Sequence, residues 1–359
     1  MSLPISFLLL IVGLALVILG ADALVEGASA IARKLGISEF VIGLTIVGMG
    51  TSAPEMVVSL LGAIKGNADI AVGNVVGSNI FNTLLILGLT AIILPIGVSR
   101  ANLRRDIPLG IFSTLLVIGL GMDLALHYGP ENTLGRIDGF ILLAAFALYI
   151  WSCFKFDDKT AQDPEEKARV NKVWVAVLYV LGGLAGLVFG GELFVDKATE
   201  IAHQFGVSDK FIAITLLAGG TSLPELATCV VAAAKKRGQL ALGNIIGSNV
   251  FNLLLILGSA AAINPLSFAD MDWIDLGVLL ASSVAVLLAA FTFKRNKIDR
   301  ADGAFLVAIW LVYMVYLFRG LCPVKKATVT GRFFHLPSAL SRQSDWRRSA
   351  GRYPGAPPG

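Results

Sequence analysis

Long apolar runs alternate with short polar segments along nearly the whole chain. Each run is long enough to cross the hydrocarbon core of a bilayer, about 30 Å thick, as an α-helix. The pattern therefore predicts an all-α integral membrane protein with about ten transmembrane helices. We place these spans at 5–32, 40–64, 70–97, 107–126, 137–154, 173–202, 211–234, 240–268, 273–293 and 303–318.

The polar positions repeat with the apolar ones. The segment Gly20–Gly88 returns as Gly190–Gly258 without a gap, and the shared residues include Gly, Pro, Glu, Asn, Ser and Thr. Because each half holds five spans, an odd number, the second half must enter the membrane the other way up. Apolar segments interrupted by Gly and Pro at matching places in two inverted halves are typical of the binding site of a secondary transporter.

The repeat divides the chain into two inverted five-helix units. Both units close with similar sequences, RIDG at Arg136–Gly139 and RADG at Arg300–Gly303, which we expect to begin spans five and ten. The predicted division is a first repeat at 1–154, a polar cytoplasmic linker at 155–172, a second repeat at 173–320 and a tail at 321–359. The tail lacks apolar periodicity, which indicates disorder or a cloning artefact.

Composition and charge agree with a membrane protein. The chain is 56% hydrophobic and 15% charged, with a mean hydropathy of +0.77, whereas soluble domains carry about 25% charged residues. The net charge of +4 comes from loops and tail, so it indicates topology and not nucleic-acid binding. Basic residues gather in alternate loops, as at Arg33–Lys34 and Lys235–Arg237. The positive-inside rule then predicts a multi-pass protein of the cell (inner) membrane with its N-terminus outside.

Several function classes lack the residues they need. The three cysteines and three histidines are scattered, and neither type forms a metal-binding or nucleophilic motif. We therefore expect no enzyme activity and no cofactor. We also expect no obligate protein partner, so that a monomer suffices.

Two carboxylates are the candidate chemistry. Glu55 and Glu225 lie near the middle of apolar spans, where a charge costs at least about 2.5 kcal/mol, so a functional reading is the default. Pro54 and Pro224 each lack an N–H and free backbone carbonyls one turn earlier. Together with these, the oxygen-bearing positions of the repeat are Gly50, Thr51, Ser52, Ser78, Asn82, Gly220, Thr221, Ser222, Ser248 and Asn252.

This set contains only hard oxygen donors. Ca²⁺ takes about 6–8 oxygen ligands, Na⁺ uses the same oxygens, and two carboxylates balance the charge of one Ca²⁺. The sequence also allows a structural explanation, because Gly73 and Gly77 form a close-packing motif, serine and threonine can bond between helices, and a proline can merely kink one. Packing alone does not account for a mid-span Glu at the same place in both copies. Gly77 also predicts a second weak point, in span three.

The two motifs resemble those of a known family. GTSxPE followed by GNxxGSNxFN, present twice, is similar to the alpha-repeats of the cation/calcium exchanger superfamily, and most of all to its prokaryotic sodium/calcium exchangers. The resemblance covers residues 3–320. It implies Ca²⁺ exchange for Na⁺ across the bilayer, with Glu55 and Glu225 as central ligands and the ten other positions above as further ion contacts. It also implies that spans one and six slide across four ion-binding spans, and matched small residues such as Gly20 and Gly190 are expected to offer the sliding surface.

One position departs from some relatives. Asn82 and Asn252 stand where members of the potassium-dependent branch have an Asp, which argues against K⁺ co-transport. Only two titratable ligands then remain, so a proton/Ca²⁺ antiporter is the second hypothesis. A passive cation channel or a structural membrane protein is less consistent with inverted halves around one site, and a channel would move Ca²⁺ without a counter-ion.

A second set of acids lies near the ends of spans one and six. Asp22 and Glu26 stand one turn apart, and Glu192 and Asp196 occupy the mirrored end. They are either solvated helix ends or acidic vestibules that concentrate cations.

Overall fold

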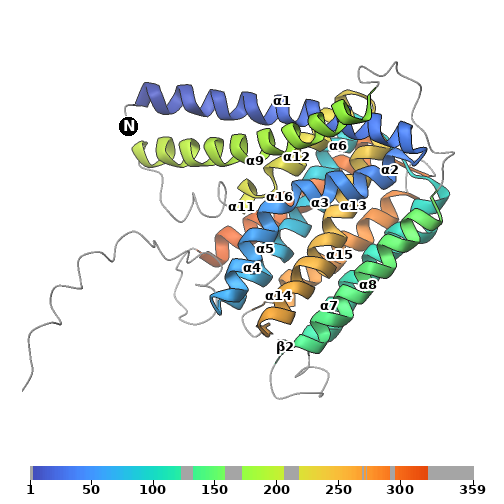
Figure 1. Cartoon of the computed structure of the whole chain (residues 1–359). Helices are drawn as coiled ribbons and strands as arrows, with labels where there is room; N and C mark the ends of the chain where they lie inside the picture. The colour runs from blue at the N-terminus through green and yellow to red at the C-terminus, as the bar shows by residue number, and fades with distance from the viewer. Residues whose placement is uncertain are drawn as a thin grey trace, which may run out of the picture.

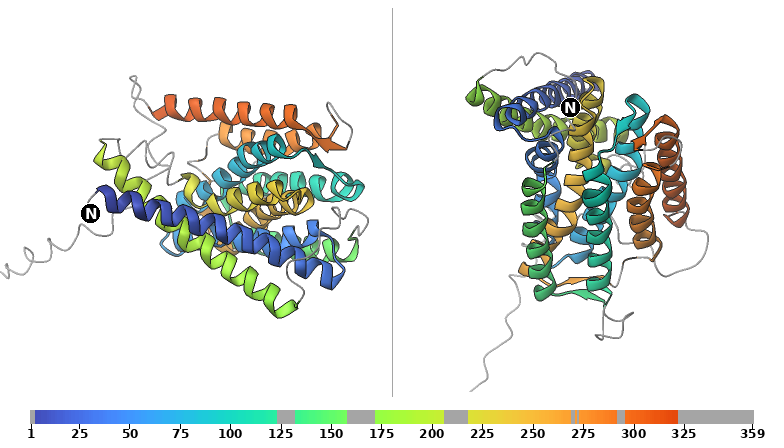
Figure 2. Two further views of the ribbon diagram at one scale, coloured as in Figure 1. Left: turned by 90° about the horizontal axis from the view of Figure 1, so that it is seen from above. Right: turned by 90° about the vertical axis from the view of Figure 1, so that its right-hand side faces the viewer.

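The structure is a computed structural model that describes residues 3–122, 132–157, 172–205, 218–268, 271, 273–291 and 296–321. It is a bundle of helices in which α1 and α9 lie side by side across the others (Figures 1 and 2). The protein is a multi-pass membrane protein: six described helices are long and apolar enough to cross a bilayer, and the pair Glu39–Thr51 and Ala53–Ile64 forms a further candidate bent by 51°. Each predicted span overlaps helix in the described residues, but the ends of 70–97 and 240–268 were wrong, because the helices stop at Ile93 and Ile263 and the chain continues into short strands. The number of crossings stays a prediction.

Up to Lys155 the elements follow the predicted pattern closely. They are α1 (Leu3–Leu35), α2 (Glu39–Ile42), the π-helical turn η1 (Gly43–Val47), α3 (Gly48–Thr51), α4 (Ala53–Ile64), α5 (Ala68–Ile80), the π-helical turn η2 (Phe81–Ile86), α6 (Leu87–Ile93), β1 (Ile96–Gly97), the π-helical turn η3 (Asn102–Asp106), α7 (Ile107–Gly121), β2 (Thr133–Leu134) and α8 (Arg136–Lys155).

The second series begins at Val173. It comprises α9 (Val173–Gln204), α11 (Ala218–Gly220), α12 (Leu223–Ala234), α13 (Gly238–Val250), the π-helical turn η5 (Phe251–Ile256), α14 (Leu257–Ile263), β3 (Leu266–Ser267), α15 (Trp273–Ala289), β4 (Lys297–Ile298) and α16 (Arg300–Leu321). From α4 to α6 every boundary recurs 170 positions later, in α12 to α14. Helices α8 and α16 begin at the arginines that the sequence indicated.

The two series interlock through matching contacts. A Cβ at Gly88 of α6 would meet Gly303 O of α16 at 2.9 Å, and one at Gly258 of α14 would meet Gly139 O of α8 at 3.0 Å. Two short antiparallel ribbons, β1 with β4 and β2 with β3, also join the series. Backbones that approach this closely need glycine at the crossing, which explains the repeated glycines at these positions.

The expected sliding surface of Gly20 and Gly190 was wrong. These glycines lie between α1 and α9, where an added Cβ would meet Leu187 N at 2.8 Å from Gly20 and Val17 N at 2.9 Å from Gly190. The two helices are antiparallel, since Gly13 faces Phe194 whereas Gly27 faces Ala176. Small residues let these two backbones touch, so α1 and α9 form one closely packed pair.

The expected weak point at Gly77 was also wrong. The helix does not break there but continues from α5 into η2, where Leu87 N bonds Asn82 O, five residues back. Span three has no proline at this point, so the hydrogen-bond ladder widens by one residue instead of opening. Such π-helical turns are frequent at functional sites, and η5 widens the equivalent helix at Asn252.

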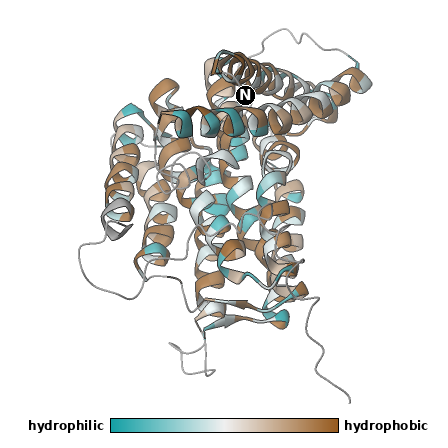
Figure 3. Ribbon diagram, turned by 90° about the vertical axis from the view of Figure 1, so that its left-hand side faces the viewer, coloured by the Kyte–Doolittle hydropathy of each residue, from teal (hydrophilic) through white to brown (hydrophobic). Residues whose placement is uncertain are grey.

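Burial separates an apolar exterior from a polar interior. Large hydrophobic side chains are exposed on the outer helices, for example Leu19, Phe140, Leu181 and Val312, whereas hydrophilic residues concentrate within the bundle (Figure 3). This arrangement is the one a protein surrounded by lipid requires.

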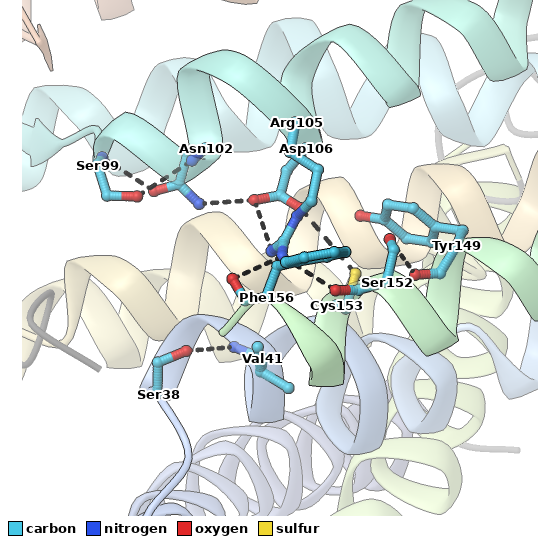
Figure 4. A network of polar contacts seen from close by, with 10 residues as sticks. All are labelled: Ser38, Val41, Ser99, Asn102, Arg105, Asp106, Tyr149, Ser152, Cys153 and Phe156. Carbon is cyan, nitrogen blue, oxygen red and sulfur yellow. Dashed lines mark hydrogen bonds and ion pairs between the residues drawn. The ribbon is translucent and has the colours of Figure 1, made fainter. Parts of the chain in front are cut away.

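A polar network at one end of the bundle joins α8 to η3 (Figure 4). Arg105 donates to the backbone oxygens of Ser152 at 3.1 Å and Phe156 at 2.8 Å, and its Nε lies 2.8 Å from Asp106 Oδ1. Ser38 caps α2 through Val41 N. Its own N–H donates to Asp157 Oδ2 at 2.9 Å, so the described start of the predicted linker holds α2, the first part of the bent span. Residues 158–171 of the linker and 322–359 of the tail lie outside the described residues.

Candidate ion-binding site

The bend between α3 and α4 places Glu55 inside the bundle. Ser52 is the junction residue, with φ −81° and ψ 10°, and Pro54 lies in the first turn of α4. Proline has no N–H, so Gly50 O loses its regular partner four residues ahead. The equivalent junction at Ser222 has φ −88° and ψ 9°, followed by Pro224. The sequence therefore interrupts both helices one turn before the carboxylate.

The two carboxylates are held reciprocally. Ser52 Oγ donates to Glu225 Oε1 at 2.7 Å, and Ser222 Oγ donates to Glu55 Oε1 at 2.9 Å. Each bond therefore joins one copy of the motif to the other. All four side chains are completely buried. The described residues thus bring together, across the two series, the acids and hydroxyls that the sequence singled out.

Four buried side-chain oxygens at predicted site positions have no hydrogen-bond partner among the described residues. They are Oε2 of Glu55 and Glu225 and Oδ1 of Asn82 and Asn252, and all four side chains are completely buried. Buried polar atoms in native proteins are normally paired, and leaving one unpaired costs about 1–3 kcal/mol. The four form two equivalent pairs, so the orphaned oxygens follow the repeat.

Several of the remaining predicted positions have less symmetric contacts. Ser248 Oγ lies 3.2 Å from Gly48 O and 3.4 Å from Glu225 Oε1. Thr51 Oγ1 lies 3.2 Å from Asn244 Oδ1. Ser78 is buried and Thr221 half-buried. Helix α9 contacts both bends, since an added Cβ would meet Leu184 at Gly50 and Val195 at Gly220.

Sequence reasoning missed a supporting pair of amides. Asn74 Nδ2 donates to Glu55 O at 3.1 Å and to Ser59 Oγ at 2.9 Å, and Asn244, its equivalent, contacts Thr51 and donates to Cys229 Sγ at 3.2 Å. Both belong to the repeated Gly-Asn dipeptide that opens the second motif. That repetition was the signal, and the side chains hold the bent helices in place.

The side-chain atoms that hydrogen-bond the two carboxylates are hydroxyl oxygens. Ser52 and Ser222 each donate to one carboxylate, and Ser248 Oγ lies 3.4 Å from Glu225 Oε1. Within the described part of the chain no three His, Cys, Asp or Glu residues gather as a group that could hold a metal ion. Hydroxyl and carboxylate oxygens suit Ca²⁺ and Na⁺ and do not suit soft metals.

Known proteins resemble the chain over nearly all of its described length. Residues 5–155 and 175–319 match the family described as sodium/calcium exchanger protein. The putative antiporter CaxA of Alkalimonas amylolytica is 39% identical over 88% of this chain and 99% of its own length. The sodium/calcium exchanger MaX1 of Methanosarcina acetivorans is 33% identical over 88% of this chain and 99% of its own.

A relative of known structure has the same fold. The sodium-calcium exchanger NCX_Mj, soaked with Na⁺ and Sr²⁺, is 32% identical and superposes with a TM-score of 0.75 over 88% of this chain and 99% of its own. The inner membrane protein YrbG of Escherichia coli is 36% identical over 86% of this chain and 96% of its own. The chain belongs to the sodium/calcium exchanger protein family.

Proposed function

We propose that the protein is a secondary antiporter that exchanges Ca²⁺ for Na⁺ by alternating access around the buried oxygen cluster. The observation that carries this proposal is the set of four orphaned buried oxygens on Glu55, Glu225, Asn82 and Asn252. In this proposal a bound cation takes these oxygens as ligands and so supplies the partner that each of them lacks. The two carboxylates would balance the charge of one Ca²⁺, and the same oxygens would hold Na⁺ in its place.

The proposed ligand set is the one that the repeat indicates. Glu55 and Glu225 are the central ligands and the asparagine oxygens complete the first group. The hydroxyls and freed carbonyls supply the rest: Thr51, Ser52, Ser78, Thr221, Ser222 and Ser248, with Gly50 and Gly220. Both halves of the site come from one chain, so a monomer suffices, and no cofactor or partner protein enters the mechanism.

The coupling ion follows from charge. Asn at both positions 82 and 252 leaves only two carboxylates, which supports K⁺-independent exchange. The name of MaX1 supports Na⁺ as counter-ion. The second candidate is proton/Ca²⁺ antiport, favoured by the absence of a third acid, because two protons on Glu55 and Glu225 would replace one Ca²⁺ without change in charge.

The membrane and orientation complete the proposal. The name of YrbG supports the inner membrane. The positive-inside distribution of Arg and Lys supports an N-terminus outside, which places Lys235 and Arg237 on the cytoplasmic side.

The direct test is uptake of ⁴⁵Ca²⁺ into proteoliposomes in which Na⁺, K⁺ or pH provides the only gradient. An outwardly directed Na⁺ gradient alone is expected to drive Ca²⁺ accumulation, without K⁺. Uptake driven by a pH step in the absence of Na⁺ would assign the protein to the proton-coupled class. Uptake with no counter-ion gradient at all would indicate a channel.

A further inference from the structure

The acids near the ends of α1 and α9 differ in their partners, although they are equivalent in sequence. On α1, Asp22 Oδ1 and Glu26 Oε1 both contact Lys235 Nζ, at 2.7 Å and 2.8 Å. Shifting each number by 170 positions gives Glu192 and Asp196 on α9 and Lys65. All three of these side chains are exposed, and the structure records no ion pair for any of them among the described residues.

The backbone at the two lysines is the same. Lys65 caps the C-terminus of α4 and bonds the oxygens of Ala63 and Leu61, and Lys235 caps α12 and bonds those of Ala233 and Val231. The two lysines therefore sit in equivalent local frames. What differs is the neighbouring helix, because α1 lies along α12 whereas α9 makes no comparable contact with α4.

A second contact shows the same asymmetry. Leu184 of α9 packs at the bend beside Gly50, but its equivalent in α1, Leu14, is 41% exposed. The α1–α9 pair therefore sits off-centre over two series that otherwise match in their boundaries. An inverted-repeat transporter reaches its opposite state when the two halves exchange conformations. The contacts that one half makes in this structure are therefore the contacts expected of the other half in the opposite state.

We infer that Lys235 and Lys65 are positioning residues that stabilise opposite states of the exchange cycle. In the state described here Lys235 holds α1 through Asp22 and Glu26. In the opposite state the α1–α9 pair moves toward α4, the Lys235 pairs break, and Lys65 holds α9 through Glu192 and Asp196. The acids on α1 and the acids on α9 thus form ion pairs in opposite states, in addition to any attraction of cations by their charge. This inference rests on the proposed alternating-access function.

Distance measurements between spin labels test the exchange of partners. The two label positions, Ile64 at the end of α4 and Gln204 at the end of α9, are both exposed and are replaced by cysteine. The native Cys153 and Cys229 are buried, and Cys322, outside the described residues, is replaced by serine in every sample. In purified full-length protein, Lys235→Ala should increase the short-distance population and Lys65→Ala should decrease it. Each change is expected to be roughly two- to fivefold, the range for a partly exposed ion pair. Lys236→Gln, next to Lys235 and outside the ion pair, is the matched control.

A charge swap separates pairing from a merely structural role. Lys65→Glu should deplete the short-distance population, and adding Glu192→Lys with Asp196→Lys should restore it. Three results would overturn the inference. The short-distance population could shift equally and in the same direction in Lys235→Ala and Lys65→Ala, it could shift in neither variant, or the charge swap could fail to restore it. These distances report helix positions and not flux, so gradient-driven ⁴⁵Ca²⁺ uptake by the unmodified protein tests the proposed function separately.

Discussion

At the scale of single residues, the reciprocal serine–carboxylate bonds carry the strongest expectation. Ser52→Ala and Ser222→Ala each remove one donor from the opposite carboxylate and one oxygen from the proposed cation. A bond to a charged group contributes about 1.5–3 kcal/mol, so each variant should weaken Ca²⁺ binding by at least about tenfold. The two losses should be similar because the bonds are equivalent.

The control for the serine variants is Ser59→Ala. Ser59 is buried in α4 and accepts a hydrogen bond from Asn74, a side chain that bonds the backbone oxygen of Glu55 and not its carboxylate. The Ser59→Ala variant should therefore lose stability without a comparable loss of Ca²⁺ affinity. Ca²⁺ titration by calorimetry measures all three variants, and an equal effect at Ser59 would remove the specific role of the serines.

The asparagines give an expectation in which stability and binding move in opposite directions. Both side-chain polar atoms of Asn82 and Asn252 are buried without partners among the described residues. Asn82→Leu or Asn252→Leu should leave the ion-free protein as stable or more stable by about 1 kcal/mol. The stabilisation gained on adding Ca²⁺ should shrink. Thermal unfolding with and without Ca²⁺ measures both effects, and an undiminished Ca²⁺ increment would exclude the asparagines as ligands.

At this scale the sequence identified the carboxylates and their serines because they stand in a repeated motif inside apolar spans. It did not reveal which partner each serine has. The bond from Ser52 reaches Glu225 and not Glu55, three residues away on its own chain segment, because the bundle places the two bends face to face. The sequence did not distinguish Asn74 from the other polar residues of the repeated motif, because its partner, the backbone oxygen of Glu55, depends on how α4 packs against α5.

At the scale of elements, the bend before each carboxylate should be necessary. Pro54→Ala or Pro224→Ala restores an N–H to the helix ladder and favours a straighter span. The 51° bend between Glu39–Thr51 and Ala53–Ile64 should decrease, which would move Glu55 away from Ser222. We expect loss of most ⁴⁵Ca²⁺ exchange with folded protein retained.

Pro108→Ala is the matched control for the bend. Pro108 lies in the first turn of α7, after the π-helical turn η3, and it belongs to neither bent helix. Its replacement should leave exchange near the level of the unmodified protein. Full exchange by both bend variants, at equal protein amounts in the vesicles, would show that the bends are incidental.

Hydrophobic periodicity located the helices well because the bilayer fixes their length and composition. It could not locate the π-helical turns, since Phe81–Ile86 is apolar throughout apart from Asn82 and Thr83 and looks like any other helical stretch. The weak point predicted at Gly77 was wrong for a different reason: a glycine permits an interruption of the helix without enforcing one, whereas a proline removes a backbone donor.

At the scale of the whole molecule, α1 and α9 should move as a unit. An added Cβ at Gly27 would lie 2.9 Å from Tyr179 Cβ, shorter than the roughly 3.5–4.5 Å between the Cβ atoms of a disulfide, so the two helices would have to separate by about 1 Å at this point to accept the cross-link. Gly27→Cys with Tyr179→Cys should then cross-link α1 to α9 and leave exchange intact. Cross-linking α1 to α12 through Asp22→Cys and Lys235→Cys with a short bismaleimide should stop it.

Exchange rates before and after complete cross-linking decide between these outcomes, with reduction of the disulfide as the internal control. If exchange continued with α1 fixed to α12, the moving-pair mechanism would be wrong for this chain. The sequence showed which glycines match between the two halves, but not which helix packs against them. A glycine indicates only that another backbone comes close.

The central claim is that one buried oxygen cluster binds Ca²⁺ and Na⁺ in turn, and equilibrium binding of ⁴⁵Ca²⁺ to the purified protein tests it most directly. The account predicts a single saturable Ca²⁺ site per chain, competitive displacement by Na⁺, and loss of that site in Glu55→Gln and in Glu225→Gln. High-affinity Ca²⁺ binding retained by either folded Gln variant, or Ca²⁺ binding indifferent to Na⁺, would contradict it.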